Sequence, residues 1–273
     1  MATGRVRKQI KETPSDAGEL KETLRQIQKR FGGIVTAGNK IPQPQRIPTG
    51  VFLLDMALLG GIPEGRITEL RGNRHSGKTS TMLRTVGYAQ RQYPDQQCVL
   101  VDTECSFDEI WATKLGVDTD KLLVIRPESG EAAADVIDAL LGTQEVALIA
   151  VDSLANMTPT AELSSSAEDS LVGQQARLLA RAMRKATSSL LTEGNRGHIP
   201  TLLTLNQFSV KIGGWSPHGG EPLTPVGGKK PGFANYVEVV IKNKENSGKN
   251  ARGVEVLTEN EHAFKIEKKD RKS

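Results

Sequence analysis

Short, nearly continuous apolar runs alternate with amphipathic stretches along most of the chain. The runs have the length and composition of strands that are buried on both faces. In the stretches between them, apolar residues recur every three or four positions, as in helices that cover a sheet. The pattern predicts an α/β fold with a mostly parallel central sheet flanked by helices. Strands are expected at 66–72, 97–104, 121–127, 146–153, 201–207, 236–244 and 262–268, and helices at 81–90, 107–116, 130–141 and 173–191.

The N-terminal part of the chain has a different pattern. Residues 16–31 repeat apolar side chains at helical spacing, which predicts one helix with a narrow apolar stripe. Such a helix is poorly stable alone in water, so it is expected to dock on the body of the chain or on a neighbouring copy. Prolines recur within 38–50, where they disfavour a helix and predict a linker. We therefore expect an N-terminal arm over 1–45 and a main domain over 46–273.

One segment of the main domain, 208–233, is rich in Gly and Pro and follows no regular period. Irregular segments longer than about 15 residues are uncommon inside compact domains and are usually functional or disordered. We therefore expect no regular structure in this segment and regard it as a candidate binding loop.

Composition narrows the class of protein only slightly. The 273 residues are 37% hydrophobic and 25% charged, as in soluble globular proteins. No apolar run is long enough to span a bilayer, and the polar N-terminus lacks the centre of a signal peptide. The two cysteines have no metal-ligand spacing, so a cytoplasmic protein without a membrane partner is expected. The net charge of +4 is compatible with nucleic-acid binding but does not establish it.

The first candidate chemistry lies between the expected strand 66–72 and the helix that follows. Gly72, Gly77, Lys78 and Thr79 have the spacing of a P-loop, G-x-x-x-x-G-K-T. Glycines let backbone N–H groups converge on a phosphate, and the helix N-terminus adds its positive dipole end. An ordinary glycine-rich turn is the alternative. Nucleotide contacts are expected from Gly72, Asn73, Arg74, His75, Ser76, Gly77, Lys78, Thr79 and Ser80.

Two acidic residues follow other expected strands. Asp152 ends the run 146–153, where it could hold Mg²⁺ together with the Thr79 hydroxyl. Glu104 ends the run 97–104, where a carboxylate could take a proton from a water that attacks the nucleotide. Each has an ordinary alternative: a strand-terminating aspartate for Asp152 and a surface loop acid for Glu104.

Taken together, these motifs resemble the RecA family of recombinases from about residue 16 to the C-terminus. The resemblance covers "LKETLRQIQKRFG", "IPTGVFLLDMALLGGIPEGRITELRG", "DTECSFDEIWATKLGVD", "AVDSLANMTPTAEL" and "LNQ", in the family's order. It implies a RecA-like P-loop ATPase core that binds ATP and Mg²⁺. It also implies a DNA-dependent ATPase that forms filaments on single-stranded DNA and pairs them with homologous double-stranded DNA for strand exchange in recombination and repair.

The resemblance also assigns roles within the nucleotide site. Glu104 matches the water-activating glutamate, and Gln207 matches the glutamine that senses the γ-phosphate. Lys78 joins them as a catalytic residue. Asp108 and Trp111 match an aspartate and an aromatic residue that contact the adenine, although the family more often has tyrosine at the second position. For Trp111, a place on the core face of its helix is the alternative.

Two segments match the family's DNA-binding loops. Arg177, Arg181 and Arg184 form one basic helical face, which by itself would usually be only a solvated surface. The irregular segment 208–233 matches the second loop, although Trp215 and Pro217 have no assigned role. The resemblance implies DNA contacts at Val172, Arg177, Arg184, Lys211, Gly227, Gly228 and Lys229.

The C-terminus departs from the family pattern. Lys268 matches the first of two lysines that reach the ATP of the adjacent subunit, but Asp270 occupies the place of the second. Lys269 or Arg271 could substitute for it. No separate C-terminal domain is expected, so the chain is either a compact variant, such as a phage-encoded one, or an incomplete chain.

Two other functions remain open at this point. The first is a helicase-like or regulatory ATPase with the same fold but without strand exchange. The second is a filament or loader protein that binds ATP and DNA without hydrolysis.

Overall fold

The computed structural model describes residues 16–31, 43–163, 173–193, 200–210, 223–246, 249–258 and 264–265. Contacts divide the chain into two units, 1–43 and 44–273, which are described separately. In the first unit, α1 (Asp16–Phe31) forms the helix that the pattern predicts. Its docking partner stays a prediction. Among the described residues, none of the helices combines the length and the apolar content needed to cross a bilayer.

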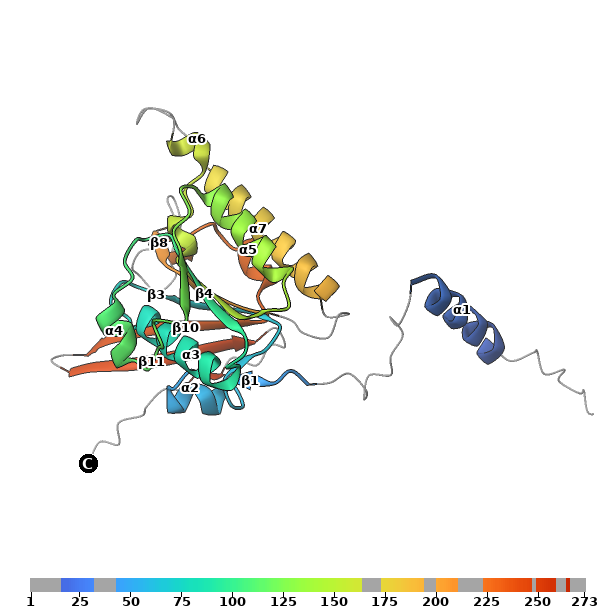
Figure 1. Cartoon of the computed structure of the whole chain (residues 1–273), viewed down its shortest axis with the longest axis horizontal. Helices are drawn as coiled ribbons and strands as arrows, with labels where there is room; N and C mark the ends of the chain where they lie inside the picture. The colour runs from blue at the N-terminus through green and yellow to red at the C-terminus, as the bar shows by residue number, and fades with distance from the viewer. Residues whose placement is uncertain are drawn as a thin grey trace, which may run out of the picture. The chain divides into compact units, whose positions relative to one another are not determined.

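The second unit is built on an eight-stranded sheet with the order β12-β11-β10-β3-β7-β6-β4-β5 (Figure 1). From β10 to β5 all neighbours are parallel, and β11 and β12 extend the sheet in antiparallel pairing. This confirms the predicted α/β class. The strands are β3 (Ile67–Gly72), β4 (Gln97–Asp102), β5 (Leu122–Ile125), β6 (Val146–Asp152), β7 (Thr201–Asn206), β10 (Val237–Asn246), β11 (Lys249–Thr258) and β12 (Phe264–Lys265).

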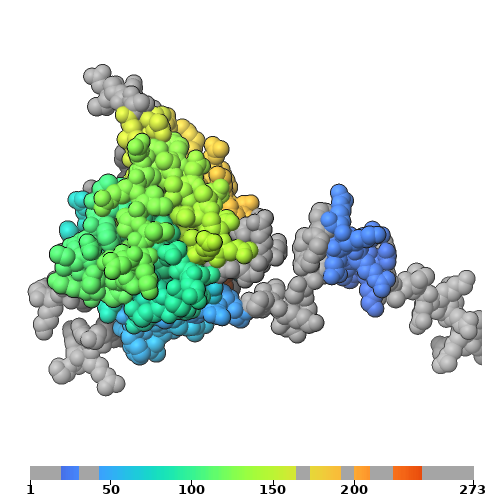
Figure 2. Space-filling model, in the orientation of Figure 1, coloured from blue at the N-terminus to red at the C-terminus, as the bar shows by residue number. Residues whose placement is uncertain are grey.

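Two apolar cores form because side chains alternate between the faces of the sheet. On β4, Cys98 and Leu100 belong to one core, and Val99 and Val101 belong to the other. The first core is covered by α2 (Phe52–Ala57), α3 (Lys78–Gln92) and α4 (Glu109–Lys114), and the second by α5 (Gly130–Leu141) and α7 (Gln174–Glu193). In Figure 2, α2 to α4 (blue to green) form the lower part of this unit and α5 with α7 (lime to orange) the upper part.

The short elements lie mainly at the loops. A two-stranded sheet joins β1 (Arg46–Ile47) to β2 (Ile62–Pro63), and another joins β8 (Phe208–Val210) to β9 (Leu223–Pro225) in antiparallel register. The remaining elements are η2 (Leu154–Asn156), α6 (Thr160–Leu163) and η3 (Pro231–Ala234).

Two sequence expectations about the end of the chain need correction. The segment 208–233 is not wholly irregular, because it contains β8, β9 and η3, each too short to give a recognisable period. Strand β11 was not expected at all. Its first half, "KNARG", is polar and shows no alternation, and antiparallel pairing with β10 holds it in the sheet.

Candidate nucleotide-binding site

The P-loop follows β3 and leads into α3, as the sequence predicts. Gly77 lies just before the helix with φ of 94°, in the left-handed region that favours glycine. A Cβ on Gly72 would lie 2.5 Å from the Ile241 carbonyl oxygen and 2.6 Å from the Ser76 hydroxyl oxygen, so no larger residue fits. The Ser76 Oγ is buried and has no hydrogen-bond partner among the described residues. A loop with glycine at these two positions and with a spare hydroxyl at Ser76 fits a phosphate group.

Lys78 lies folded back onto its own loop. Its Nζ donates hydrogen bonds to the carbonyl oxygens of Gly72 at 2.9 Å and Asn73 at 2.8 Å. Burial lowers the pKa of Lys78, and the charges of Asp152 and Glu104 act in the opposite direction. The cation is thus held within its own loop by two neutral acceptors, which phosphate oxygens can replace.

Thr79 and Asp152 meet at the end of the sheet. The Thr79 hydroxyl donates to Asp152 Oδ2 at 3.0 Å. Burial raises the pKa of Asp152 to about 6, and the nearby charge of Glu104 contributes to the increase. In the part of the chain that the structure describes, no three His, Cys, Asp or Glu side chains cluster as metal ligands. A hydroxyl and one carboxylate fit Mg²⁺, which takes its other ligands from phosphate and water.

Glu104 lies beside these groups, just after β4. Its Oε1 accepts a hydrogen bond from the Ser153 hydroxyl at 2.7 Å and another from the Gln207 amide nitrogen at 3.0 Å. Sequence reasoning missed Ser153. Its position directly after Asp152, at the end of the strand next to β4, is a signal that could have indicated it.

Gln207 connects Glu104 to the second candidate DNA loop. It directly follows β7 and precedes β8, and its carbonyl oxygen accepts a hydrogen bond from Val226 N at 3.0 Å. Val226 directly follows β9 and precedes Gly227 and Gly228. One residue thus contacts the candidate water-activating carboxylate through its side chain and the candidate DNA segment through its main chain.

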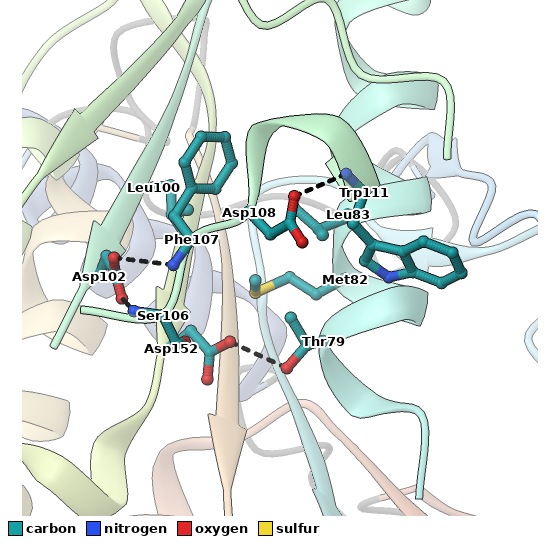
Figure 3. A pocket seen from close by; sticks show the side chains of 10 residues that line it. All are labelled: Thr79, Met82, Leu83, Leu100, Asp102, Ser106, Phe107, Asp108, Trp111 and Asp152. Atoms are coloured by element: carbon teal, nitrogen blue, oxygen red, sulfur yellow. Dashed lines mark hydrogen bonds between the residues drawn. The ribbon is translucent and has the colours of Figure 1, made fainter. Parts of the chain in front are cut away.

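The candidate adenine contacts line a small pocket with the candidate metal ligands (Figure 3). Asp108 caps α4 by accepting a hydrogen bond from Trp111 N at 2.9 Å. The Trp111 indole N–H donates to the Ser80 hydroxyl at 3.2 Å, and the side chain is half-exposed, so Trp111 is not a core residue of its helix. The lining residues are Thr79, Met82, Leu83, Leu100, Asp102, Ser106, Phe107, Asp108, Trp111 and Asp152.

Asp102, which lies close to Glu104 in the sequence, has a structural role. Its carboxylate accepts hydrogen bonds from the main-chain N–H groups of Ser106 at 3.1 Å and Phe107 at 3.2 Å. The Nε of Arg126 forms an ion pair with the Oδ2 of Asp102 at 3.3 Å. Asp102 therefore shapes the loop that carries Glu104.

The candidate DNA residues that the structure describes lie on α7 and in the segment that follows β9. Arg177, Arg181 and Arg184 are exposed on α7. Gly227 and Gly228 have φ of 84° and 75°, and a Cβ on Gly227 would lie 2.6 Å from Leu179 Cδ1 of α7. Gly227 therefore packs against buried Leu179 of the helix that carries the arginines, whereas a Cβ on Gly228 would meet no atom within 4 Å, and Lys229 is exposed. Val172, Lys211 and Lys268 lie outside the described residues, as do Trp215, Pro217, Lys269, Asp270 and Arg271.

Comparison with known proteins decides the family. The profile of the RecA N-terminal domain matches residues 18–269. The chain belongs to the RecA family. Protein RecA of Mycobacteroides abscessus is 39% identical over 238 residues, which are 86% of this chain and 66% of that protein.

Other relatives have similar coverage. Protein RecA of an Arthrobacter species is 38% identical, with 84% of this chain and 64% of that protein covered. Protein RecA of a Sulfurovum species is 40% identical, with 82% and 63% covered. This RecA-family chain thus spans slightly less than two thirds of the length of these relatives.

Proposed function

We propose that the protein is a cytoplasmic DNA-dependent ATPase that forms ATP-bound filaments on single-stranded DNA. In this proposal it pairs the filament with homologous double-stranded DNA and exchanges strands in recombination and repair. Family membership supports the general class. The observation that carries the finer proposal is the contact between Glu104 and Gln207, because it joins a candidate hydrolytic carboxylate to a candidate DNA loop.

The nucleotide would be held by residues that already surround the pocket. Lys78 would exchange its two carbonyl acceptors for phosphate oxygens. Thr79 and Asp152 would hold Mg²⁺, whose charge offsets that of the phosphates. Trp111 offers an aromatic face for the adenine, and its N–H bond to Ser80 fixes the ring next to the P-loop.

Glu104 would act as the general base. The Ser153 and Gln207 donors both bind Oε1, and no described contact occupies Oε2, whose lone pairs can take a proton from water. If Gln207 turns toward the γ-phosphate, Glu104 loses one donor and becomes a stronger base. The same movement displaces the main chain that Val226 contacts, which would pass the change to the DNA loop.

DNA would be bound through its backbone. Exposed Arg177, Arg184 and Lys229 offer cations, and Gly227 and Gly228 have no Cβ to keep a phosphate away from the main chain, where the Gly228 N–H at present donates to the Pro225 carbonyl oxygen at 2.9 Å. Such contacts do not read base identity, so binding should tolerate any sequence and weaken strongly with salt. Between subunits, α1 would pack on a neighbouring copy, and Lys268 with Lys269 or Arg271 would reach the neighbour's ATP.

Hydrolysis measured with and without single-stranded DNA tests the proposal, in the wild type and in Glu104→Gln. We expect DNA to stimulate the wild type and the substitution to lower the stimulated rate by about a hundredfold or more. ATP-dependent DNA binding should persist, because the substitution changes neither the phosphate nor the DNA contacts. Equal wild-type rates with and without DNA would contradict the proposal. DNA stimulation without joint-molecule formation would instead favour a helicase-like or regulatory ATPase.

A further inference from the structure

A second group of polar residues lies buried in the sheet, outside the nucleotide pocket. Glu69 and Arg71 lie on β3, Asn206 ends β7, and Asn235 and Glu238 lie before and on β10. We call these five residues the Glu69 network. Glu69, Asn206 and Asn235 are almost completely buried, and Arg71 is buried beside them. The strand register places Glu69 opposite Glu238, and Arg71 opposite Asn206.

The charges in this network are matched by contacts. Arg71 donates to Glu69 Oε1 at 2.6 Å and forms two bonds of 2.7 Å to the carboxylate of Glu238. Burial alone would lower the pKa of Arg71, but its bonds to the two glutamates raise it. Two glutamates at paired positions repel each other, and the guanidinium between them offsets part of that repulsion, although burial and the charge of Glu69 still raise the pKa of Glu238. Glu69 is thus a fixed anchor, held by the guanidinium of Arg71.

Glu69 uses its remaining acceptor capacity on two amides. Its Oε1 accepts from the Asn206 side-chain nitrogen at 2.9 Å, and its Oε2 accepts from that of Asn235. Asn206 then makes two contacts toward the DNA loop. Its nitrogen also reaches the Val226 carbonyl oxygen at 3.2 Å, and its oxygen accepts from Gln207 N at 2.8 Å. The orientation of this one amide therefore fixes the main chain on both sides of the candidate sensor contact.

We propose that Glu69 is a positioning residue that orients Asn206 and so holds Gln207 and Val226 as one unit between the nucleotide and the second DNA loop. Without this anchor, the Asn206 amide can turn, and of these contacts Val226 keeps only its main-chain bond to Gln207, so less of a movement of Gln207 reaches it. With it, the displacement of Gln207 at Glu104 moves Val226 and the glycine pair against α7. This inference rests on the proposed function, because it names how that function links its two sites.

Glu69→Gln tests this role with almost no change in volume. The substitution turns one acceptor oxygen into an NH₂ group that faces donors, so at least one bond to Arg71, Asn206 or Asn235 is lost. We expect DNA stimulation of hydrolysis to fall at least about fivefold, with the DNA-free rate within about twofold of wild type. Amide hydrogen exchange at Gln207 and Val226 should become about tenfold faster or more, without nucleotide or DNA. A purely structural role would lower both hydrolysis rates together and would overturn the proposal.

Thr68→Val is the matched control. Thr68 is the neighbour of Glu69 on β3, is equally buried, and its hydroxyl has no hydrogen-bond partner among the described residues. The control should leave stimulation and exchange unchanged.

Should Glu69→Gln fail to fold, Asn206→Ser removes the amide and its bonds to Glu69, Gln207 and Val226, and leaves Glu69 bonded to Arg71 and Asn235. It carries the same expectations. Unchanged exchange at Gln207 and Val226 in either variant would overturn the inference even if DNA stimulates the wild type. Faster exchange in a protein that DNA never stimulates would contradict the proposed function and still support the positioning role.

Discussion

The phosphate end and the sensor end of the candidate site are built in different ways. At the phosphate end, Lys78 contacts carbonyl oxygens only five and six residues away in its own loop. At the sensor end, Gln207 meets Glu104 across 103 residues and Asn206 meets Glu69 across 137. A local loop can form its binding site whenever β3 and α3 are in place. A long-range network forms only when β3, β4, β7 and β10 are all packed together.

This difference suggests a division of labour. Changes at the phosphate end should act on the binding of nucleotide and metal, because their contacts are confined to one loop and one strand end. Changes at the sensor end should leave binding intact and act on the link between hydrolysis and DNA. Asp152 lies between the phosphate end and the sensor end, because it contacts Thr79 of the P-loop but belongs to a different strand, β6. A change at Asp152 therefore tests whether the two ends act separately.

The largest effect in this comparison is expected from Asp152→Asn in protein free of metal and nucleotide. The folded protein raises the pKa of Asp152 from 3.8 to about 6, so the folded state holds the proton more tightly. This stabilisation is complete below about pH 4 and is lost as the pH rises through about 6, at a cost of about 3 kcal/mol. The variant has no such titration, so at about pH 8 its free energy of unfolding should exceed that of wild type.

Urea unfolding across this pH range measures the difference in the free energy of unfolding between the variant and the wild type. The contributions of the other carboxylates cancel in this difference, because both proteins have them. The difference should shrink toward zero near about pH 4. Adding Mg²⁺ and ATP should reverse the order, because only the wild type keeps the anionic ligand. A difference that does not depend on pH would contradict this account of Asp152.

Much of the phosphate end was predictable because its signals are local or follow from sheet geometry. The glycines, Lys78 and Thr79 stand within one loop. Asp152 and Glu104 follow adjacent parallel strands, whose carboxyl ends meet at one edge of the sheet. The fold class was predictable for the same reason, since nearly every strand of the parallel sheet is a continuous apolar run.

The Glu69 network was not predictable, although part of its signal is present. Glu69 and Arg71 are two residues apart in a buried strand, so they share a face, and an ion pair there could have been expected. Their partners Asn235 and Glu238 lie more than 160 residues away. No spacing rule connects such distant positions. Only the strand order, with β10 beside β3, brings them together.

A smaller effect is expected from Ser80→Ala, which tests whether the candidate adenine contact at Trp111 affects nucleotide binding alone, as we expect of the phosphate end. The Ser80 hydroxyl accepts the only bond that joins the Trp111 ring to the P-loop helix among the described contacts. Its loss should weaken ATP binding by about fivefold, as for one partly exposed hydrogen bond. The rate at saturating ATP and its stimulation by DNA should not change. Equilibrium binding of ATP measures the expected loss of affinity, and an unchanged affinity would contradict the role of the bond between Ser80 and Trp111.

The smallest effect is expected from Arg184→Ala, which separates DNA binding from the link to hydrolysis. Arg184 is exposed on α7 and has no described bond to the Glu69 network, so its loss should remove one phosphate contact. The affinity for single-stranded DNA should fall severalfold for all sequences, and the slope of log affinity against log salt should become shallower by about 0.9. At saturating DNA, stimulation should equal that of wild type. If stimulation at saturating DNA falls as it does in Glu69→Gln, DNA binding and the link to hydrolysis cannot be separated. A surface arginine would then affect stimulation in the same way as the buried Glu69 network.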